Sequence, residues 1–100
     1  MKLTELKGII ENIPVTNDCK ETYVELYDTM IDYWSELDDW FDNLPFNERC
    51  EDLLDNFITM DCGLFKLNDF GQPEKASIGD LTNLKEELLT CINEEIKRSK

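Results

Sequence analysis

The chain has 100 residues, of which 41% are hydrophobic and 10% aromatic, and its formal net charge at pH 7 is −13. This size and composition predict a single globular domain over residues 1–100 with a modest core, and they exclude a disordered chain. A net negative charge repels phosphates, so we expect no direct binding to nucleic acid or to an anionic membrane.

The sequence has no apolar run near the ~20 residues that a membrane-spanning helix needs. Its N-terminal segment, MKLTELK, has an acid and amphipathic spacing where a secretory signal peptide needs an uninterrupted apolar stretch. We therefore expect a cytoplasmic protein, located in the host cell cytoplasm if a phage encodes it.

A first, short helix is predicted from Thr4 to Ile13. Thr4 is a suitable N-cap, and Pro14 ends the helix because proline cannot continue it. Four residues at spacings of three and four form its apolar stripe: Leu6, Ile9, Ile10 and Ile13.

The second predicted helix is the dominant one and spans residues 18–44. Asp18 with Glu21 forms a capping box at its start, and Pro45 follows its end. Its apolar positions recur every three or four residues: Tyr23, Tyr27, Met30, Trp34, Leu37, Phe41 and Leu44. At 1.5 Å per residue, this helix would be about 40 Å long.

A third helix is predicted to begin at Asn47 and to end at Gly63, with Phe57 and Ile58 facing inward. Residues 64–76 form a turn-rich connector in which 64–67 could be a short extended segment. The last helix starts near Ser77 or Asp80. The predicted fold is therefore all-α, a small bundle of about four helices around one long central helix.

The predicted long helix carries a line of acids without compensating bases. Between Lys20 and Arg49 there are twenty-eight residues with nine acids and no base. Eight pairs of these acids and Asp18 are three or four positions apart, so their repulsion would cost about 2–4 kcal/mol. Two interpretations remain open: a solvated polar face, or a docking surface for a basic groove. The cost slightly favours the docking surface.

Two aromatic residues, Tyr33 and Trp40, lie between the acidic face and the apolar stripe. Aromatic side chains beside charge are typical of interaction hot spots, although another helix could cover them instead. Trp34 is predicted to lie in the core. The candidate partner-binding residues are Glu21, Glu25, Asp28, Asp32, Tyr33, Glu36, Asp39, Trp40, Asp42, Glu48, Glu51, Asp52 and Asp55.

We expect no catalytic residues, no metal site and no cofactor. The chain has no histidine, which removes the commonest general base. Its four cysteines are too far apart for the paired ligands of a zinc site, and Cys50 and Cys91 fit apolar helix positions as reduced core thiols. No glycine-rich phosphate loop is present among four glycines. The protein is therefore not expected to be an enzyme.

In composition and in the acidic pattern of residues 18–55, the chain resembles small acidic inhibitors that phages use against host nucleases: anti-CRISPR, anti-restriction and glycosylase-inhibitor proteins. This resemblance implies a class of function and no particular fold or residues. We expect a protein-binding inhibitor that blocks the basic nucleic-acid channel of a target protein by partial DNA or RNA mimicry.

Two other functions remain open. The chain could be an acidic immunity protein or antitoxin that neutralises a basic toxin. It could also be a helical adaptor or dimerisation module, in which apolar residues make the contact. Its oligomeric state does not follow from the sequence.

Overall fold

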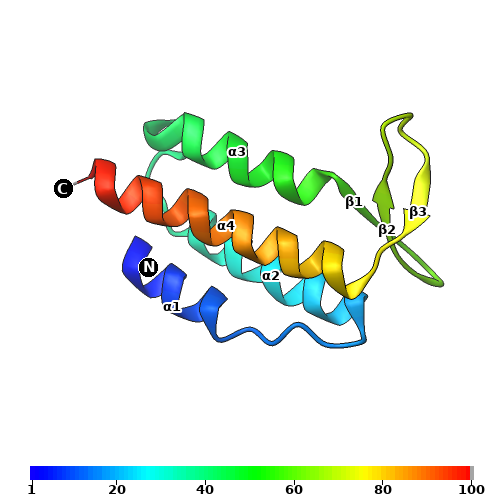
Figure 1. Ribbon diagram of the computed structural model, residues 1–100. Coiled ribbons are helices and arrows are strands. Elements are labelled where there is room, and N and C mark those ends of the chain that lie inside the picture. The colour runs from blue at the N-terminus through cyan, green and yellow to red at the C-terminus, as the bar shows by residue number, and fades with distance from the viewer. Residues whose placement is uncertain (100) are drawn as a thin grey trace.

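The computed structural model describes residues 1–99, which form a helical bundle with a small sheet at one end (Figure 1). Both termini lie at the other end. The elements are α1 Leu3–Glu11, α2 Cys19–Ser35, the 3-10 helix η1 Trp40–Asn43, α3 Leu44–Asp55, β1 Phe57–Met60, β2 Gly63–Leu67, β3 Pro73–Lys75 and α4 Ile78–Arg98.

The predicted all-α class is wrong, because the structure is 64% helical and 12% strand. Helix α3 ends at Asp55, and residues that we expected in its last turns form β1. β1 pairs antiparallel with β2, and β2 with β3. The β-branched Ile58 and Thr59 favour strand over helix, and they lie opposite Phe65 and Leu64. The extended segment expected at 64–67 is present as part of β2.

The predicted long helix is also wrong, because it is interrupted after Ser35. Asp39 instead starts η1, where its carboxylate accepts a hydrogen bond from the backbone N–H of Phe41 at 2.9 Å. Pro45, expected to follow the helix, lies in the first turn of α3, where proline is well tolerated. Asp39 at the cap and Asp42 in the first turn of η1 lie at a helix start, where negative charge is favourable.

Helix α4 lies at the centre of the bundle and packs against α1, α2 and α3 (Figure 1). It begins after Ser77, as predicted, with a capping box between Ser77 and Asp80. Its buried residues are Leu81, Leu84, Leu88, Cys91, Ile92 and Glu95.

The buried face of α2 is rotated from the predicted one. It consists of Thr22, Tyr23, Leu26, Met30 and Tyr33. Tyr27 and Phe41 were expected inward, but they are 39% and 69% exposed, and Trp34 is only partly buried. α2 packs against α1 and α4, and Leu26 and Tyr33, which were not in the predicted stripe, are 0% and 3% exposed.

Helix α1 begins at Leu3 with Lys2 at the N-cap position, two residues before the predicted cap. Its C-terminal end is fixed by a side chain from α4. The Lys85 ammonium donates hydrogen bonds to the carbonyl oxygens of Glu11 at 3.0 Å and Ile13 at 2.6 Å. Positive charge at a helix C-terminus also complements the helix dipole.

Replacing Lys85 by Met should therefore lower the free energy of unfolding by about 1–2 kcal/mol, because two carbonyl groups lose their charged donor. Denaturant unfolding followed by circular dichroism measures the loss. Lys97→Met, at an exposed lysine in the last turn of α4, is the matched control. Equal stability of the two variants would contradict the capping role of Lys85.

Candidate functional site

All eleven acids of the predicted partner-binding surface are exposed in the structure. Of these eleven acids, only Glu36 forms an ion pair within residues 1–99, with the N-terminal ammonium of Met1. Arg49, the one base between Glu21 and Asp55, binds Glu94 of α4 instead. Ten exposed carboxylates therefore have no ion-pair partner in the described part of the chain, although Asp39 also caps η1.

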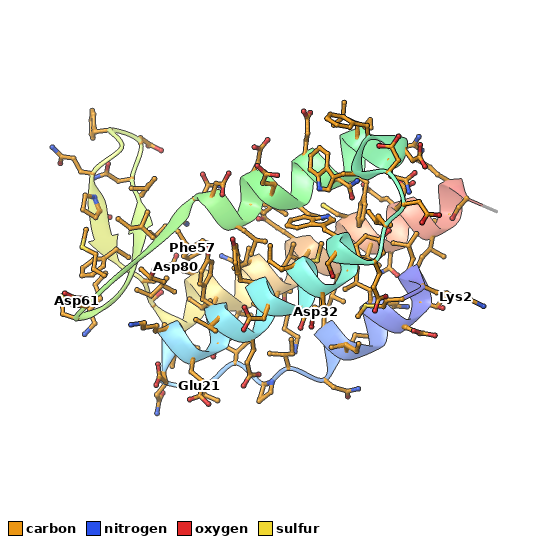
Figure 2. The ribbon with its side chains drawn as sticks, turned by 180° about the vertical axis from the view of Figure 1, so that it is seen from behind. Lys2, Glu21, Asp32, Phe57, Asp61 and Asp80 are labelled. Carbon is orange, nitrogen blue, oxygen red and sulfur yellow. The ribbon has the colours of Figure 1, made fainter. Side chains whose placement is uncertain are left out.

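Eight of these acids form two rows of four, because α2 and α3 run antiparallel beside each other, and the other three (Glu36, Asp39 and Asp42) lie between the two helices. The Tyr23 hydroxyl donates to the carbonyl of Leu54 at 3.0 Å, and the Trp34 indole N–H donates to the side-chain oxygen of Asn47 at 3.1 Å. In Figure 2, Glu21 and Asp32 lie on the side of α2 turned away from α3. The α2 row is therefore separated from the row on α3, which consists of Glu48, Glu51, Asp52 and Asp55.

An apolar strip lies on α2 between its acids and α3. Val24, Tyr27 and Ile31 are 39%, 39% and 40% exposed, and their spacing places them on one helix face. The partly buried Trp34 continues the strip by three residues. We missed this strip, because we assigned Tyr27 and Trp34 to the core. The sequence did contain a signal for it: the apolar residues of 19–35 cover more of the helix circumference than one packed face can bury, so some of them had to be exposed.

The strip adjoins an open hollow of about 560 Å³ between α2, the end of α3 and β1. Asp28 and Asp55 line it from opposite helices. Tyr27 stacks on Tyr23, with ring centroids 5.9 Å apart, and Tyr23 packs on Phe57 at 5.7 Å. Burial, with the nearby Tyr27 and Asp55, raises the pKa of Tyr23 to about 12.

The two predicted aromatic contact residues differ in position. Tyr33 is only 3% exposed and packs edge-on against Phe46, so it belongs to the core and leaves the candidate surface. Trp40 is half-buried and contacts the rings of Trp34 and Phe41, with centroid distances of 6.5 and 5.5 Å. Trp40 therefore remains at the surface, where its cluster continues the apolar strip beyond the end of α2.

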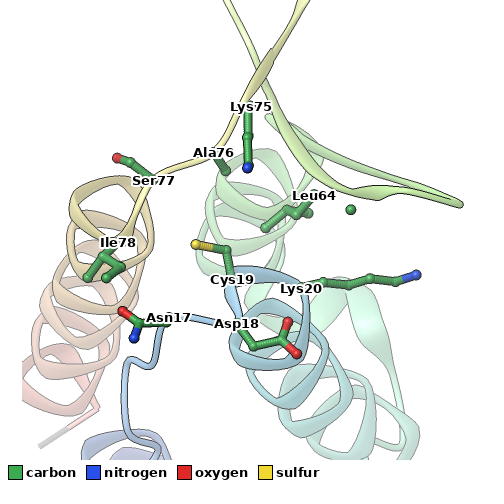
Figure 3. Close-up of a pocket in the computed structure, with 10 residues that line it drawn as sticks. Asn17, Asp18, Cys19, Lys20, Leu64, Lys75, Ala76, Ser77 and Ile78 are labelled. Carbon is green, nitrogen blue, oxygen red and sulfur yellow. The ribbon is translucent and has the colours of Figure 1, made fainter.

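A second hollow, of about 410 Å³, lies where the N-termini of α2 and α4 approach each other (Figure 3). Both helix ends have their own caps: Asp18 accepts from the backbone N–H of Glu21 at 3.0 Å, and Ser77 accepts from that of Asp80 at 3.3 Å. The backbone hydrogen bond from Ser77 also lowers the pKa of Asp80. Lys20 and Lys75 line this hollow, and the Ser77 hydroxyl donates to the Asp80 carboxylate at 3.1 Å as part of the helix cap.

No group of three Cys, Asp or Glu side chains within residues 1–99 is arranged to hold a metal ion. None of the helices in this range has both the length and the apolar character to cross a membrane. No protein-family model, curated protein or solved structure matches the chain. The function is therefore inferred from the exposed acids and the apolar strip.

The four cysteines are free thiols in different surroundings. Cys50 and Cys91 are buried between α3 and α4, and burial raises the pKa of both. Cys19 is half-buried, and Cys62 is exposed in the turn between β1 and β2. The expectation of core thiols is thus met for two of the four.

Under native conditions, Cys62 should react fastest with a thiol reagent such as Ellman's reagent, and Cys50 and Cys91 should react only after unfolding. Absorbance at 412 nm follows the reaction, and Cys62→Ser should remove the fast phase. A fast phase in that variant with the amplitude of two thiols would show that the α3–α4 interface is open.

The raised pKa of Tyr23 predicts a loss of stability in alkali. With a folded pKa near 12 and an unfolded one near 10, stabilisation by the protonated phenol is complete below about pH 10. It falls as pH rises to 12, because only the unfolded chain then releases the proton. Two pKa units set a ceiling of about 2.7 kcal/mol. Denaturant unfolding between these pH values should show a smaller decline for Tyr23→Phe, and an identical decline would contradict the assignment.

Proposed function

We propose that this protein is an acidic, protein-binding inhibitor that acts in the cytoplasm and blocks the basic nucleic-acid channel of a target protein. The observation that carries the proposal is the exposed surface of eleven carboxylates on α2, α3 and the residues between them. Ten of these have no ion-pair partner within residues 1–99.

Electrostatics supports a basic partner. Residues 18–55 contain thirteen acids and two bases, and Arg49 binds Glu94 outside this surface. A field of this kind attracts a cationic cleft, speeds association and weakens as salt concentration rises. Carboxylates on successive turns are about 5.4 Å apart, whereas duplex DNA has one phosphate per about 1.7 Å of its axis. The mimicry is therefore of a local charge pattern rather than of a whole duplex.

An immunity protein or antitoxin would use the same surface against a basic toxin. The nature of the bound partner separates the two functions: a nucleic-acid-binding enzyme supports the inhibitor, and a toxin encoded beside this chain supports the alternative. Simple dimerisation through the apolar strip is disfavoured, because each copy has a net charge of −13 and acids on both sides of the strip.

The test combines capture of a partner with competition. Proteins from the host cell are bound to the immobilised chain at low salt and eluted by a salt gradient. Each nucleic-acid-binding protein recovered is then assayed for DNA or RNA binding with and without the free chain. We expect competition that fades between about 50 and 500 mM salt.

The triple variant Glu25→Lys, Asp28→Lys and Asp32→Lys should weaken competition at least tenfold, because each change reverses a charge that faces solvent. Glu36 and Asp39 are left intact because they bind Met1 and cap η1.

A matched control changes net charge equally at the exposed Glu5, Glu86 and Glu87, which lie on α1 and α4. If the control and the triple variant compete equally well, net charge rather than this surface causes binding, and the proposal is wrong. A recovered partner whose DNA or RNA binding is unaffected would also refute it.

A further inference from the structure

A groove begins at the open hollow between α2, Asp55 at the end of α3, and β1, and it combines an apolar floor on α2 with carboxylates on both sides. The floor is the strip of Val24, Tyr27 and Ile31, each about two-fifths exposed. Asp28 of α2 and Asp55 of α3 line the same hollow from opposite sides. Glu51 precedes Asp55 by one turn on α3 and is also exposed, so the row of carboxylates on α3 continues along the groove.

We propose that this groove binds a cationic amphipathic helix of the partner protein. The apolar face of that helix covers Tyr27 and Ile31, and Lys or Arg side chains on both of its flanks meet the carboxylates of α2 and α3. This proposal rests on the proposed function, because it names the element through which a basic partner is held.

The shape of the groove fits a helix. α2 and α3 lie antiparallel, joined near one end by Tyr23 and Leu54 and near the other by Trp34 and Asn47. A third helix packs naturally between two such helices, with side-chain ridges entering the groove. From Val24 to Trp34 the strip is ten residues and thus about 15 Å long. That length matches about three turns of a partner helix with anchors at i, i+3 or i+4, and i+7.

The floor is held in place before a partner arrives. Tyr27 stacks on Tyr23, whose hydroxyl is fixed to the Leu54 carbonyl and whose ring packs on Phe57. Trp34 is fixed through its indole N–H to Asn47, which is fully buried and also donates to the carbonyl of Trp40 at 2.5 Å. Aromatic anchors with few free torsions lose little entropy on binding.

Charge selects this occupant over a second copy of the chain. A copy would bring a net charge of −13 to a groove already bordered by carboxylates. Like charges brought together in this way disfavour the wrong partner, whereas cationic flanks are attracted. The two-sided arrangement of acids further requires basic residues on both flanks of the bound helix.

A peptide experiment tests the groove independently of any natural target. The probe is a fluorescein-labelled peptide of about 18 Leu and Lys residues with all Leu on one helical face. The comparison peptide has the same composition in an order that gives no apolar face. Fluorescence anisotropy at about 150 mM salt measures both affinities, and circular dichroism verifies that each protein variant is folded.

For the unaltered protein, we expect the amphipathic peptide to bind at least about tenfold more tightly than the comparison peptide. The double variant Tyr27→Ser and Ile31→Ser should abolish this preference while leaving the weak binding of the comparison peptide unchanged. The control variant Ile9→Ser and Ile78→Ser removes equally exposed apolar side chains from α1 and α4 and should keep the preference.

The acids have their own test. The double variant Asp28→Asn and Asp55→Asn should lower the affinity for the amphipathic peptide several-fold and reduce the salt dependence of its binding. NMR shift changes should map to α2 and α3. Equal affinity for both peptides, a preference that survives Tyr27→Ser and Ile31→Ser, or shift changes confined to other elements would overturn the groove assignment.

The two proposals fail separately. If the peptide preference is absent but acid reversal still abolishes competition with a nucleic-acid-binding protein, the groove proposal alone is wrong. If the preference is present and maps to α2 and α3, but no captured protein loses its nucleic acid, the groove stands and the inhibitor proposal is wrong.

Discussion

The break in the helical chain after Ser35 determines the arrangement on which the candidate site depends. A helix continued to residue 44 would place the acids from Glu21 to Asp42 on one rod, many of them at the spacings of three and four residues where like charges repel. The chain instead leaves α2 at Ser35, and Asp39 caps η1. α3 can then return alongside α2. The acids of residues 21–32 and 48–55 thereby lie on two neighbouring helices, and Glu36, Asp38 and Asp39 lie in the segment between them.

Bringing two acidic helices together has an electrostatic cost that other contacts must offset. The offsetting contacts are side-chain hydrogen bonds across the interface, from Tyr23 to Leu54 and from Trp34 to Asn47. The ring of Tyr33 on α2 also packs edge-on against Phe46 of α3, and Tyr23 packs against Phe57 of β1. Most of the acids remain in water, where their repulsion is screened. Trp34, which bonds to Asn47 of α3, also continues the apolar strip at the surface.

The sequence predicted local features better than their assembly. The caps at Asp18 and Ser77 and the exposure of the acids followed from residue type and spacing. The break after Ser35 could not be read from apolar spacing, because the positions 34, 37, 41 and 44 continue a helical pattern that tertiary contacts override. The strand at 57–60 was hidden for a similar reason: a short apolar run fits either a helix or a strand until its partner is known.

The exposed rows of carboxylates have one consequence for regulation. The chain contains no histidine, the side chain whose charge ordinarily changes between about pH 5 and 8. A mild acidification of the cell therefore has no imidazole to protonate on this surface. A shift in complex formation across that interval would therefore not involve an imidazole of this chain, and pH profiling of a complex would test first for histidines of the other protein.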